Sequence, residues 1–150
     1  MPQSYTYHLF HGVYATKERR PWLEPTMIPQ LAGVTGDIIR KRKGCLIAFN
    51  AMPDHVHFLA HFSHTAYLPD MYRDIKAISS GWIRDTFPHM RGFAWQRGYS
   101  SFSVGMATLD SVKRYIRIQQ SHHRTRTFEE ELISMLDKCK IPYDRRYLFD

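Results

Sequence analysis

Apolar and polar positions alternate with two different periods along the first half of the chain. A run rich in Tyr, Phe, Val and Leu predicts a strand from Tyr5 to Ala15. Apolar residues at helical spacing predict a helix from Thr26 to Lys43. The apolar segments Cys45–Met52 and His55–Phe62 predict two strands, joined by the turn Pro53-Asp54. This half of the chain therefore has the order strand, helix, strand, strand.

The second half is richer in helical patterns. Its predicted elements are a helix at Leu68–Phe87, a strand at Trp95–Val104, helices at Asp110–His123 and Phe128–Cys139, and a closing strand or ordered tail at Tyr143–Phe149. Neither a repeat nor a low-complexity tract nor a linker interrupts residues 1–150, so we expect one domain. The combined order predicts an α+β fold with a mainly antiparallel sheet, close to the ferredoxin-like split βαβ arrangement.

One predicted strand has an unusually polar face. Along His55–Phe62, one side carries Val56, Phe58, Ala60 and Phe62, and the other carries His55, His57, Leu59 and His61. Successive strand residues point to opposite faces of a sheet, so the first side is predicted to face the core. The second side places histidines on a strand that otherwise reads as internal.

Composition narrows the class of partner. The 150 residues are 43% hydrophobic, with a formal net charge of +7, which is typical of a folded basic domain that binds nucleic acid or an acidic membrane surface. No apolar stretch approaches the roughly 20 residues that span a bilayer, and the N-terminal residues lack a signal-peptide pattern. We therefore expect nucleic acid as partner, no membrane association and a cytoplasmic location. Cys45 and Cys139 are expected to be ordinary buried or semi-buried thiols.

The pair His55 and His57 is a candidate metal site. Two neutral imidazoles on one face of a rigid strand can hold a divalent cation, with further ligands completing its coordination. Nine histidines occur in the chain, so short spacings also arise by chance. The other interpretation is that both residues cap the hairpin through backbone hydrogen bonds.

Tyr115 is a candidate nucleophile. It lies four residues before Gln119 on a predicted helix, so the two side chains are expected to share a helix face. The basic residues around it, Arg114 and Arg117 among them, would attract phosphate and favour phenolate. The alternative is a half-buried helix aromatic beside a solvated basic surface.

Taken together, these residues describe phosphoryl transfer. A cation held by His55 and His57 would neutralise charge on a scissile phosphate, and Tyr115 would attack to form a phosphotyrosine link. Gln119 could reach the cation through its carboxamide oxygen, a hard neutral ligand that suits Mg²⁺ or Mn²⁺.

The chain resembles the single-tyrosine transposases of the HUH superfamily, the insertion-sequence-200/605 type. The resemblance extends over nearly the whole length. It is carried by the segments Thr16–Pro21, Met52–Leu59, Ile75–Ser80, Trp95–Tyr99, Phe102–Val104, Tyr115–Gln119, His122–His123 and Phe128–Glu131. The histidine motif followed by the tyrosine, the later glutamine and the Trp-Gln-x-Gly-Tyr segment, all in this order, makes it specific.

The resemblance implies an HUH endonuclease-type domain that acts in transposition and DNA recombination. Such enzymes cut single-stranded DNA at ends recognised partly as hairpins, leaving a 5′-phosphotyrosine and a free 3′ hydroxyl. They are homodimers in which the tyrosine helix of one subunit can complete the metal site of the other. By residue-wise transfer, His55, His57 and Gln119 are the metal ligands and Tyr115 is the nucleophile. His61, His122 and His123 receive no role.

Basic residues and aromatic side chains are further candidates for DNA contact. The basic candidates are Lys17, Arg19, Arg20, Arg40, Lys41, Arg42, Lys43, Arg114 and Arg117. For any single one of them, a solvated surface is the alternative. Trp22, Tyr67, Trp82 and Trp95 could stack on bases, although core packing is expected for most of them.

Three other functions are alternatives to the transposase hypothesis. A hairpin-binding module descended from such an enzyme would not need the histidines, the tyrosine and the glutamine together. A replication initiator or relaxase of the same superfamily usually carries further domains, and some carry paired tyrosines. A metal phosphohydrolase unrelated to DNA should have a carboxylate-rich ligand set, whereas Asp54 is the only acid beside the histidines and is interpreted as a turn residue.

Overall fold

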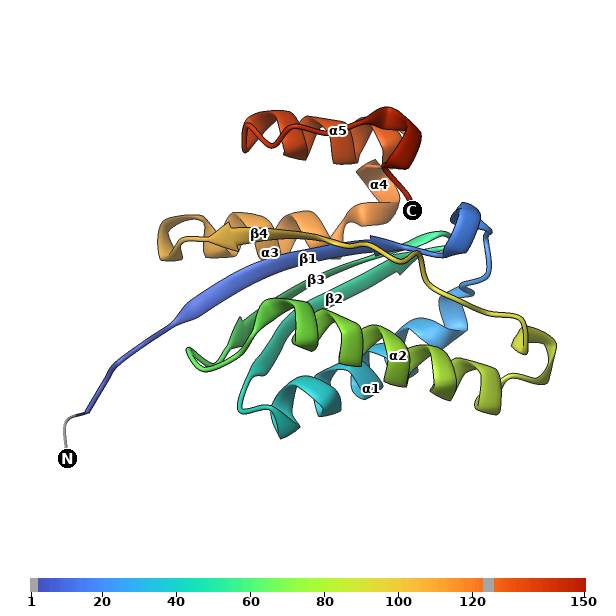
Figure 1. Cartoon of the computed structure of the whole chain (residues 1–150), viewed down its shortest axis with the longest axis horizontal. Helices are drawn as coiled ribbons and strands as arrows, with labels where there is room; N and C mark the ends of the chain where they lie inside the picture. The colour runs from blue at the N-terminus through green and yellow to red at the C-terminus, as the bar shows by residue number, and fades with distance from the viewer. Residues whose placement is uncertain (1–2, 123–125) are drawn as a thin grey trace.

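A four-stranded antiparallel sheet forms the centre of the protein. The computed structural model describes residues 3–122 and 126–150, and its strands lie in the order β2-β3-β1-β4 (Figure 1). Their bounds are β1 (His8–Ala15), β2 (Cys45–Met52), β3 (His55–Phe62) and β4 (Ser100–Val104). The predicted α+β fold of ferredoxin-like split βαβ type is confirmed, because β1 and β3 occupy the middle and all three pairings are antiparallel.

Helices cover both faces of the sheet. In Figure 1, α1 (Ile28–Lys41) and α2 (Leu68–Thr86) lie on one side, and α3 (Leu109–Arg117) and α5 (Phe128–Lys138) lie on the other. The short helix α4 (Gln119–His122) connects the last two. In the described part of the chain, no helix is both long and apolar enough to cross a membrane.

The alternation along β3 divides the core into two layers. Val56, Phe58 and Phe62 point toward α1 and α2 and join the largest apolar cluster. The ring of Phe58 crosses so close over β1 that a Cβ atom at Gly12 would lie 2.3 Å from it. This close approach of a ring to the backbone requires glycine at the centre of β1.

The opposite face of the sheet is closed by α3 and α5. Val13 and Ala15 of β1 pack against Phe128 and Leu132 of α5, while Leu59 of β3 meets α3. The histidines of β3 lie on this second face and are therefore covered by helices that come late in the sequence. The polar face noted in the sequence is thus an enclosed layer between the sheet and the C-terminal helices.

Several predicted boundaries are wrong for local reasons. β1 begins at His8, because residues 3–7 make no ladder with the rest of the sheet. Only residues 100–104 of the predicted strand at 95–104 pair with β1, and Trp95 makes an isolated bridge to Thr16. Of the two alternatives predicted for residues 143–149, the strand is wrong and the ordered tail is confirmed, with a single 3₁₀ turn at Arg145–Tyr147.

The predicted helix at 110–123 is interrupted at Ile118, whose dihedrals of −106° and 27° leave the helical region. Asn50 of β2 explains the position of the break. Its side-chain nitrogen donates to the carbonyl oxygens of Ile116 at 2.9 Å and Arg117 at 3.3 Å. Carbonyls at a helix end have no partner within the helix, so a buried amide that satisfies them stabilises the end. His123 lies outside the described residues.

Candidate metal and tyrosine site

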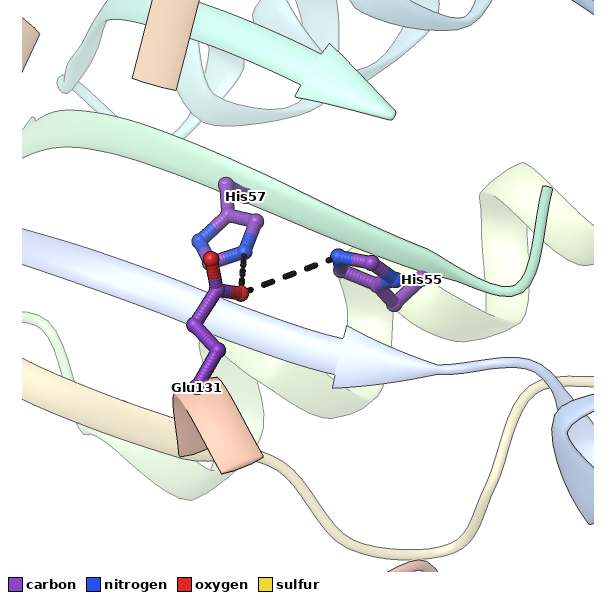
Figure 2. A group of neighbouring side chains, drawn as sticks. All are labelled: His55, His57 and Glu131. Carbon is purple, nitrogen blue, oxygen red and sulfur yellow. Dashed lines mark hydrogen bonds and ion pairs between the residues drawn. The ribbon is translucent and has the colours of Figure 1, made fainter. Parts of the chain in front are cut away.

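Three buried side chains converge at one end of the sheet. His55 and His57 project from the same face of β3, and Glu131 reaches them from α5 (Figure 2). The Oε1 atom of Glu131 lies 2.8 Å from Nε2 of His57 and 3.8 Å from Nε2 of His55. The predicted placement of the two histidines on one face is confirmed, and a carboxylate joins them.

The second nitrogen of each imidazole also has a partner. Nδ1 of His55 lies 2.7 Å from Oδ1 of Asp54, and Nδ1 of His57 lies 2.9 Å from Nε2 of His11 on β1. Metal-bound histidines usually donate their other ring N–H in this way, which fixes the ring and its tautomer. Both rings are thereby oriented with Nε2 toward Glu131.

The donor set fits a divalent cation. One donor atom from each of His55, His57 and Glu131 lies within 4.8 Å of the other two, and all three residues are buried. Two imidazoles and one carboxylate are ligands that divalent metals accept. A buried carboxylate is costly without a compensating positive charge, so a cation held between it and the two rings would stabilise this arrangement.

Glu131 is the site residue that sequence reasoning missed, and the expectation that Asp54 is the only acid beside the histidines is wrong. Residues 129–131 are three consecutive glutamates, and any of them could have faced solvent. A usable signal was the helical spacing of Phe128, Glu131 and Leu132, which places one acid within an apolar stripe. Asp54 is also more than a turn residue, since it holds the ring of His55.

Opposing influences act on the Asp54 carboxyl. Burial acts to raise its pKa. The hydrogen bond and charge of His55 and the charge of Arg19 lower it by more than burial raises it, so the pKa lies below the usual value. Asp54 therefore stays ionised and accepts the Nδ1–H proton of His55. His11 has the reverse character, because burial and the neighbouring His57 lower its pKa to about 3. A neutral His11 can share a single proton with His57 without introducing charge.

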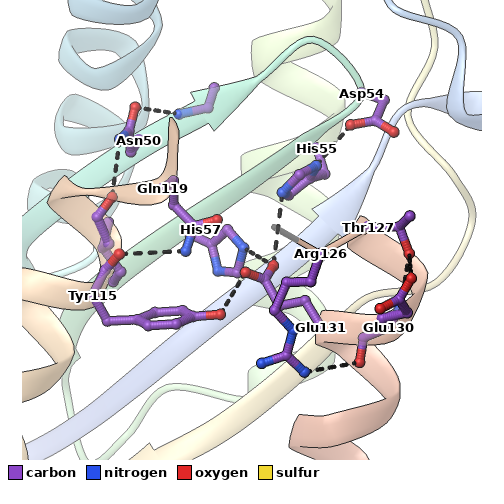
Figure 3. A network of polar contacts seen from close by, with 12 residues as sticks. Asn50, Asp54, His55, His57, Tyr115, Gln119, Arg126, Thr127, Glu130 and Glu131 are labelled. Carbon is purple, nitrogen blue, oxygen red and sulfur yellow. Dashed lines mark hydrogen bonds and ion pairs between the residues drawn. The ribbon is translucent and has the colours of Figure 1, made fainter. Parts of the chain in front are cut away.

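Tyr115 points into the same cluster from α3. Its hydroxyl donates to Oε2 of Glu131 at 2.5 Å, so one carboxylate contacts both the tyrosine and His57 (Figure 3). Burial raises the pKa of Tyr115, and the hydrogen bond to Glu131 and its negative charge raise it further. Gln119 and Arg126 act in the opposite direction. Tyr115 is half-buried on its helix, as the alternative expected, but its hydroxyl is directed at the cluster; its role as nucleophile stays a prediction.

Gln119 lies close to the tyrosine despite the break in the helix. It is fully buried at the first position of α4, and its side-chain nitrogen donates to the backbone oxygen of Tyr115 at 3.3 Å. The expected shared face of one continuous helix is wrong, because Ile118 separates α3 from α4. The role of Gln119 as a metal ligand stays a prediction.

The basic candidates fall into three groups. Lys17, Arg19 and Arg20 follow β1 directly, and the last residue of β1, Ala15, pairs with His55, so this group adjoins the site. Residues 40–43 lie at the other end of the sheet, since β2 begins there and pairs with the end of β3 at His61. Arg114 and Arg117 are exposed on α3, on either side of Tyr115.

His61 and the aromatic candidates have surroundings of their own. His61 stacks on Tyr7, with centroids 4.7 Å apart, at the far end of β3; the side chain of His122 and all of His123 lie outside the described residues. Core packing is confirmed for the three tryptophans, which join the main apolar cluster, while Tyr67 is exposed. Both cysteines are free but exposed, so their expected burial is wrong.

Comparison with known proteins gives a consistent family. Residues 4–119 match the sequence model of the family described as "Transposase IS200 like". ISDra2 transposase TnpA of Deinococcus radiodurans is 25% identical over 123 residues, covering 78% of this chain and 88% of that protein.

Two solved structures share the fold. A crystal structure of a Deinococcus radiodurans protein assigned as a transposase aligns with a TM-score of 0.64 and 27% identity, covering 79% of this chain and 96% of the other. The structure of a REP-associated tyrosine transposase bound to a REP hairpin aligns with a TM-score of 0.60 and 17% identity, covering 82% of this chain and 74% of the other. At that identity, the second likeness concerns the fold alone.

Proposed function

The chain belongs to the family of IS200-like transposases, and on that premise we propose that it cleaves and rejoins single-stranded DNA through a 5′-phosphotyrosine intermediate. One observation carries the proposal. The hydroxyl of Tyr115 and the imidazole of His57 meet on the same buried carboxylate, Glu131. The proposed nucleophile thus shares a carboxylate with the cluster that would hold a cation.

The proposed reaction is a transesterification. The oxygen of Tyr115 forms a bond to the scissile phosphorus while the bond from phosphorus to the 3′ oxygen breaks. The tyrosine loses its proton, and the departing strand gains one as it becomes a free 3′ hydroxyl. Since one phosphodiester replaces another, a 3′ hydroxyl can later reverse the exchange and rejoin strands without an outside energy source.

We propose Mg²⁺ or Mn²⁺ as the cofactor, held by His55 and His57 with Glu131 or Gln119 as a third ligand. When bound, the cation would neutralise charge that develops on the phosphate. Asp54 and His11 would hold the two rings in place. Glu131 accepts the hydrogen bond of the Tyr115 hydroxyl. This bond favours the protonated tyrosine and directs its oxygen toward the cluster.

We further propose a hairpin-bearing DNA single strand as the substrate, a homodimer as the working form and the cytoplasm as the location. The net charge of +7 supports a nucleic-acid partner. A solved structure of similar fold was obtained with a REP hairpin bound, which makes a hairpin the first substrate to test.

A hairpin-binding module that does not cut DNA is the second candidate function. It would retain the basic surface and the fold. However, it has no need for a tyrosine hydroxyl directed at a buried cluster of two histidines and a glutamate. The intact arrangement therefore favours the enzyme.

A denaturing gel tests this proposal. Purified protein is mixed with labelled single-stranded DNA from the flanks of its own gene and Mn²⁺ or Mg²⁺. We expect a covalent protein–DNA band that Tyr115→Phe abolishes and that a chelator prevents, because the phenol oxygen forms the bond. Tyr99→Phe, which alters another hydroxyl on the opposite side of the sheet, is the matched control and should leave the band in place. Tight hairpin binding by folded, metal-loaded protein without any adduct would favour the binding module.

A further inference from the structure

A basic cavity that the proposed chemistry does not use lies beside the metal and tyrosine site. Its volume is about 610 Å³, within the range of roughly 300 to 1,000 Å³ that ligand pockets occupy. Three segments distant in sequence form its walls: residues 17–19, 94–97 and 145–150. We call it the basic pocket; the residues that matter here are Lys17, Arg19, Arg97, Arg145, Arg146 and Phe149.

Positive charge dominates the basic pocket. Five cationic side chains line it, against the carboxylates of Glu18 and Asp150. Two of the arginines have acidic neighbours, Arg145 with Glu129 at 3.1 Å and Arg146 with Asp144 at 2.7 Å, but both guanidinium groups remain largely exposed. Within residues 3–122 and 126–150, neither Lys17 nor Arg97 has an ion-pair partner. Such a cavity would attract a polyanion.

The walls of the pocket are fixed by buried hydrogen bonds. Gln96, only 7% exposed, accepts from the backbone nitrogen of Ala15 at 2.6 Å and donates to the backbone oxygen of Asp150 at 3.0 Å. Lys76 of α2 donates to the carbonyls of Arg97 and Gly98 at 2.8 and 2.7 Å. These bonds tie two of the wall segments, at Gln96, Arg97 and Asp150, to the sheet and to α2, so these walls are formed before any ligand binds.

A continuous stack of flat groups connects the pocket with the metal cluster. The guanidinium of Arg19 lies 4.6 Å from the ring centre of Phe149. Phe149 meets Phe128 at 5.3 Å, and Phe128 lies parallel to the ring of His55 at 3.7 Å. The pocket therefore adjoins the metal cluster through direct side-chain contacts.

We infer that the basic pocket binds an unpaired nucleotide of the DNA single strand next to the scissile phosphate. Lys17, Arg97 and Arg146 would contact phosphates, and the stacked pair of Arg19 and Phe149 would pack against the base. Electrostatic contacts to the backbone combined with stacking surfaces are how proteins hold single strands, whose bases expose their faces. Residues 145–150 lie beyond residue 119, where the family match ends. The inference rests on the proposed function for its choice of DNA.

The test measures binding without cleavage. All proteins carry Tyr115→Phe and are kept in chelator, and the probe is a fluorescein-labelled oligothymidylate followed by anisotropy over a range of salt concentrations. Arg97→Ala with Arg146→Ala removes two charges from the pocket. Arg73→Ala with Arg91→Ala removes two exposed charges that do not line the pocket and is the matched control.

We expect the pocket pair to weaken binding by about tenfold and to reduce the salt slope by about 1.4, since each phosphate contact to a single strand contributes about 0.7. The control pair should change affinity less than about twofold. Phe149→Ala should weaken single-strand binding about fivefold without changing the salt slope, because it removes a stacking face but no charge. Equal losses in both pairs, or none in the pocket pair, would overturn the inference.

A duplex of the same length separates base stacking from general phosphate attraction. If Phe149→Ala weakened duplex and single strand equally, the pocket would not hold an unpaired base. The result of this binding test is also independent of the test of the proposed function. The covalent adduct is measured on a denaturing gel with proteins that keep Tyr115. Adduct formation that survives Arg97→Ala with Arg146→Ala, together with unchanged binding, would refute the pocket alone.

Discussion

At the scale of single residues, Glu131 has the largest number of functional contacts. One oxygen contacts His57 and the other contacts the hydroxyl of Tyr115. The same carboxylate therefore links the cluster that would hold a cation with the group that would attack phosphate. Its neighbour Glu130 is exposed and accepts a hydrogen bond from Thr127 at the start of α5, so two adjacent glutamates have separate tasks.

Glu131→Gln should weaken Mn²⁺ binding by more than about tenfold in titration calorimetry. Changes even to residues outside the immediate ligands commonly cost 10- to 100-fold, and this change removes the only carboxylate among the three candidate ligands. Glu130→Gln is the matched control, with the same chemical change one residue away. Gln119→Ala decides between the two candidate third ligands. Should Glu131→Gln bind Mn²⁺ as well as Glu130→Gln does, the carboxylate is not a ligand.

At the scale of elements, side-chain hydrogen bonds join the loop between α2 and β4 to α2. Lys76 donates to the carbonyls of Arg97 and Gly98, and Trp95 donates its ring N–H to Ser79 at 3.0 Å. These bonds explain why only part of the predicted strand joins the sheet. The backbone between Trp95 and Gly98 is held by α2 and by single contacts with the end of β1 and with Asp150.

Lys76 should give the protein a measurable pH dependence of stability. Burial lowers its pKa from 10.5 to about 8, so between these values the unfolded chain binds more protons than the folded one, and this group makes stability rise with pH. The free energy of unfolding is measured by urea titration at several pH values. The difference between the unaltered protein and Lys76→Met should rise with pH by at most about 1.4 kcal/mol per pH unit, which is the limit for one proton. Lys41→Met, an exposed change, should retain the rise. Parallel pH profiles for the protein and Lys76→Met would contradict the burial of this charge.

At the scale of the whole molecule, the helices that follow the sheet decide where the chemistry lies. Helices α3 and α5 bring Tyr115 and Glu131 over the face that carries His57 (Figure 3). Within a single chain the tyrosine hydroxyl already reaches the cluster. The trans arrangement that the family resemblance implies is therefore not needed to complete this site.

Mixing two inactive proteins tests which chain supplies the tyrosine. Tyr115→Phe lacks the nucleophile, and His57→Ala lacks a metal ligand. Tyr115 contacts Glu131 of its own chain, so we expect the mixture to form less than a tenth of the adduct of the unaltered protein on a denaturing gel. A tenfold difference in rate corresponds to about 1.4 kcal/mol in the activation barrier. Wild-type protein mixed with each variant is the control for exchange of subunits. Adduct on the His57→Ala chain in the mixture would show that the tyrosine acts in trans.

The sequence by itself determined the central sheet and half of the site. A compact apolar run predicted the bounds of β2. Period-two alternation along β3 predicted the common face of His55 and His57, because strand geometry is local. The tertiary structure alone decided the rest: Asn50 ends α3 beside Gln119, and Glu131 enters the cluster from α5. A helix can present any of three consecutive glutamates to a sheet, and only packing against a distant strand selects one.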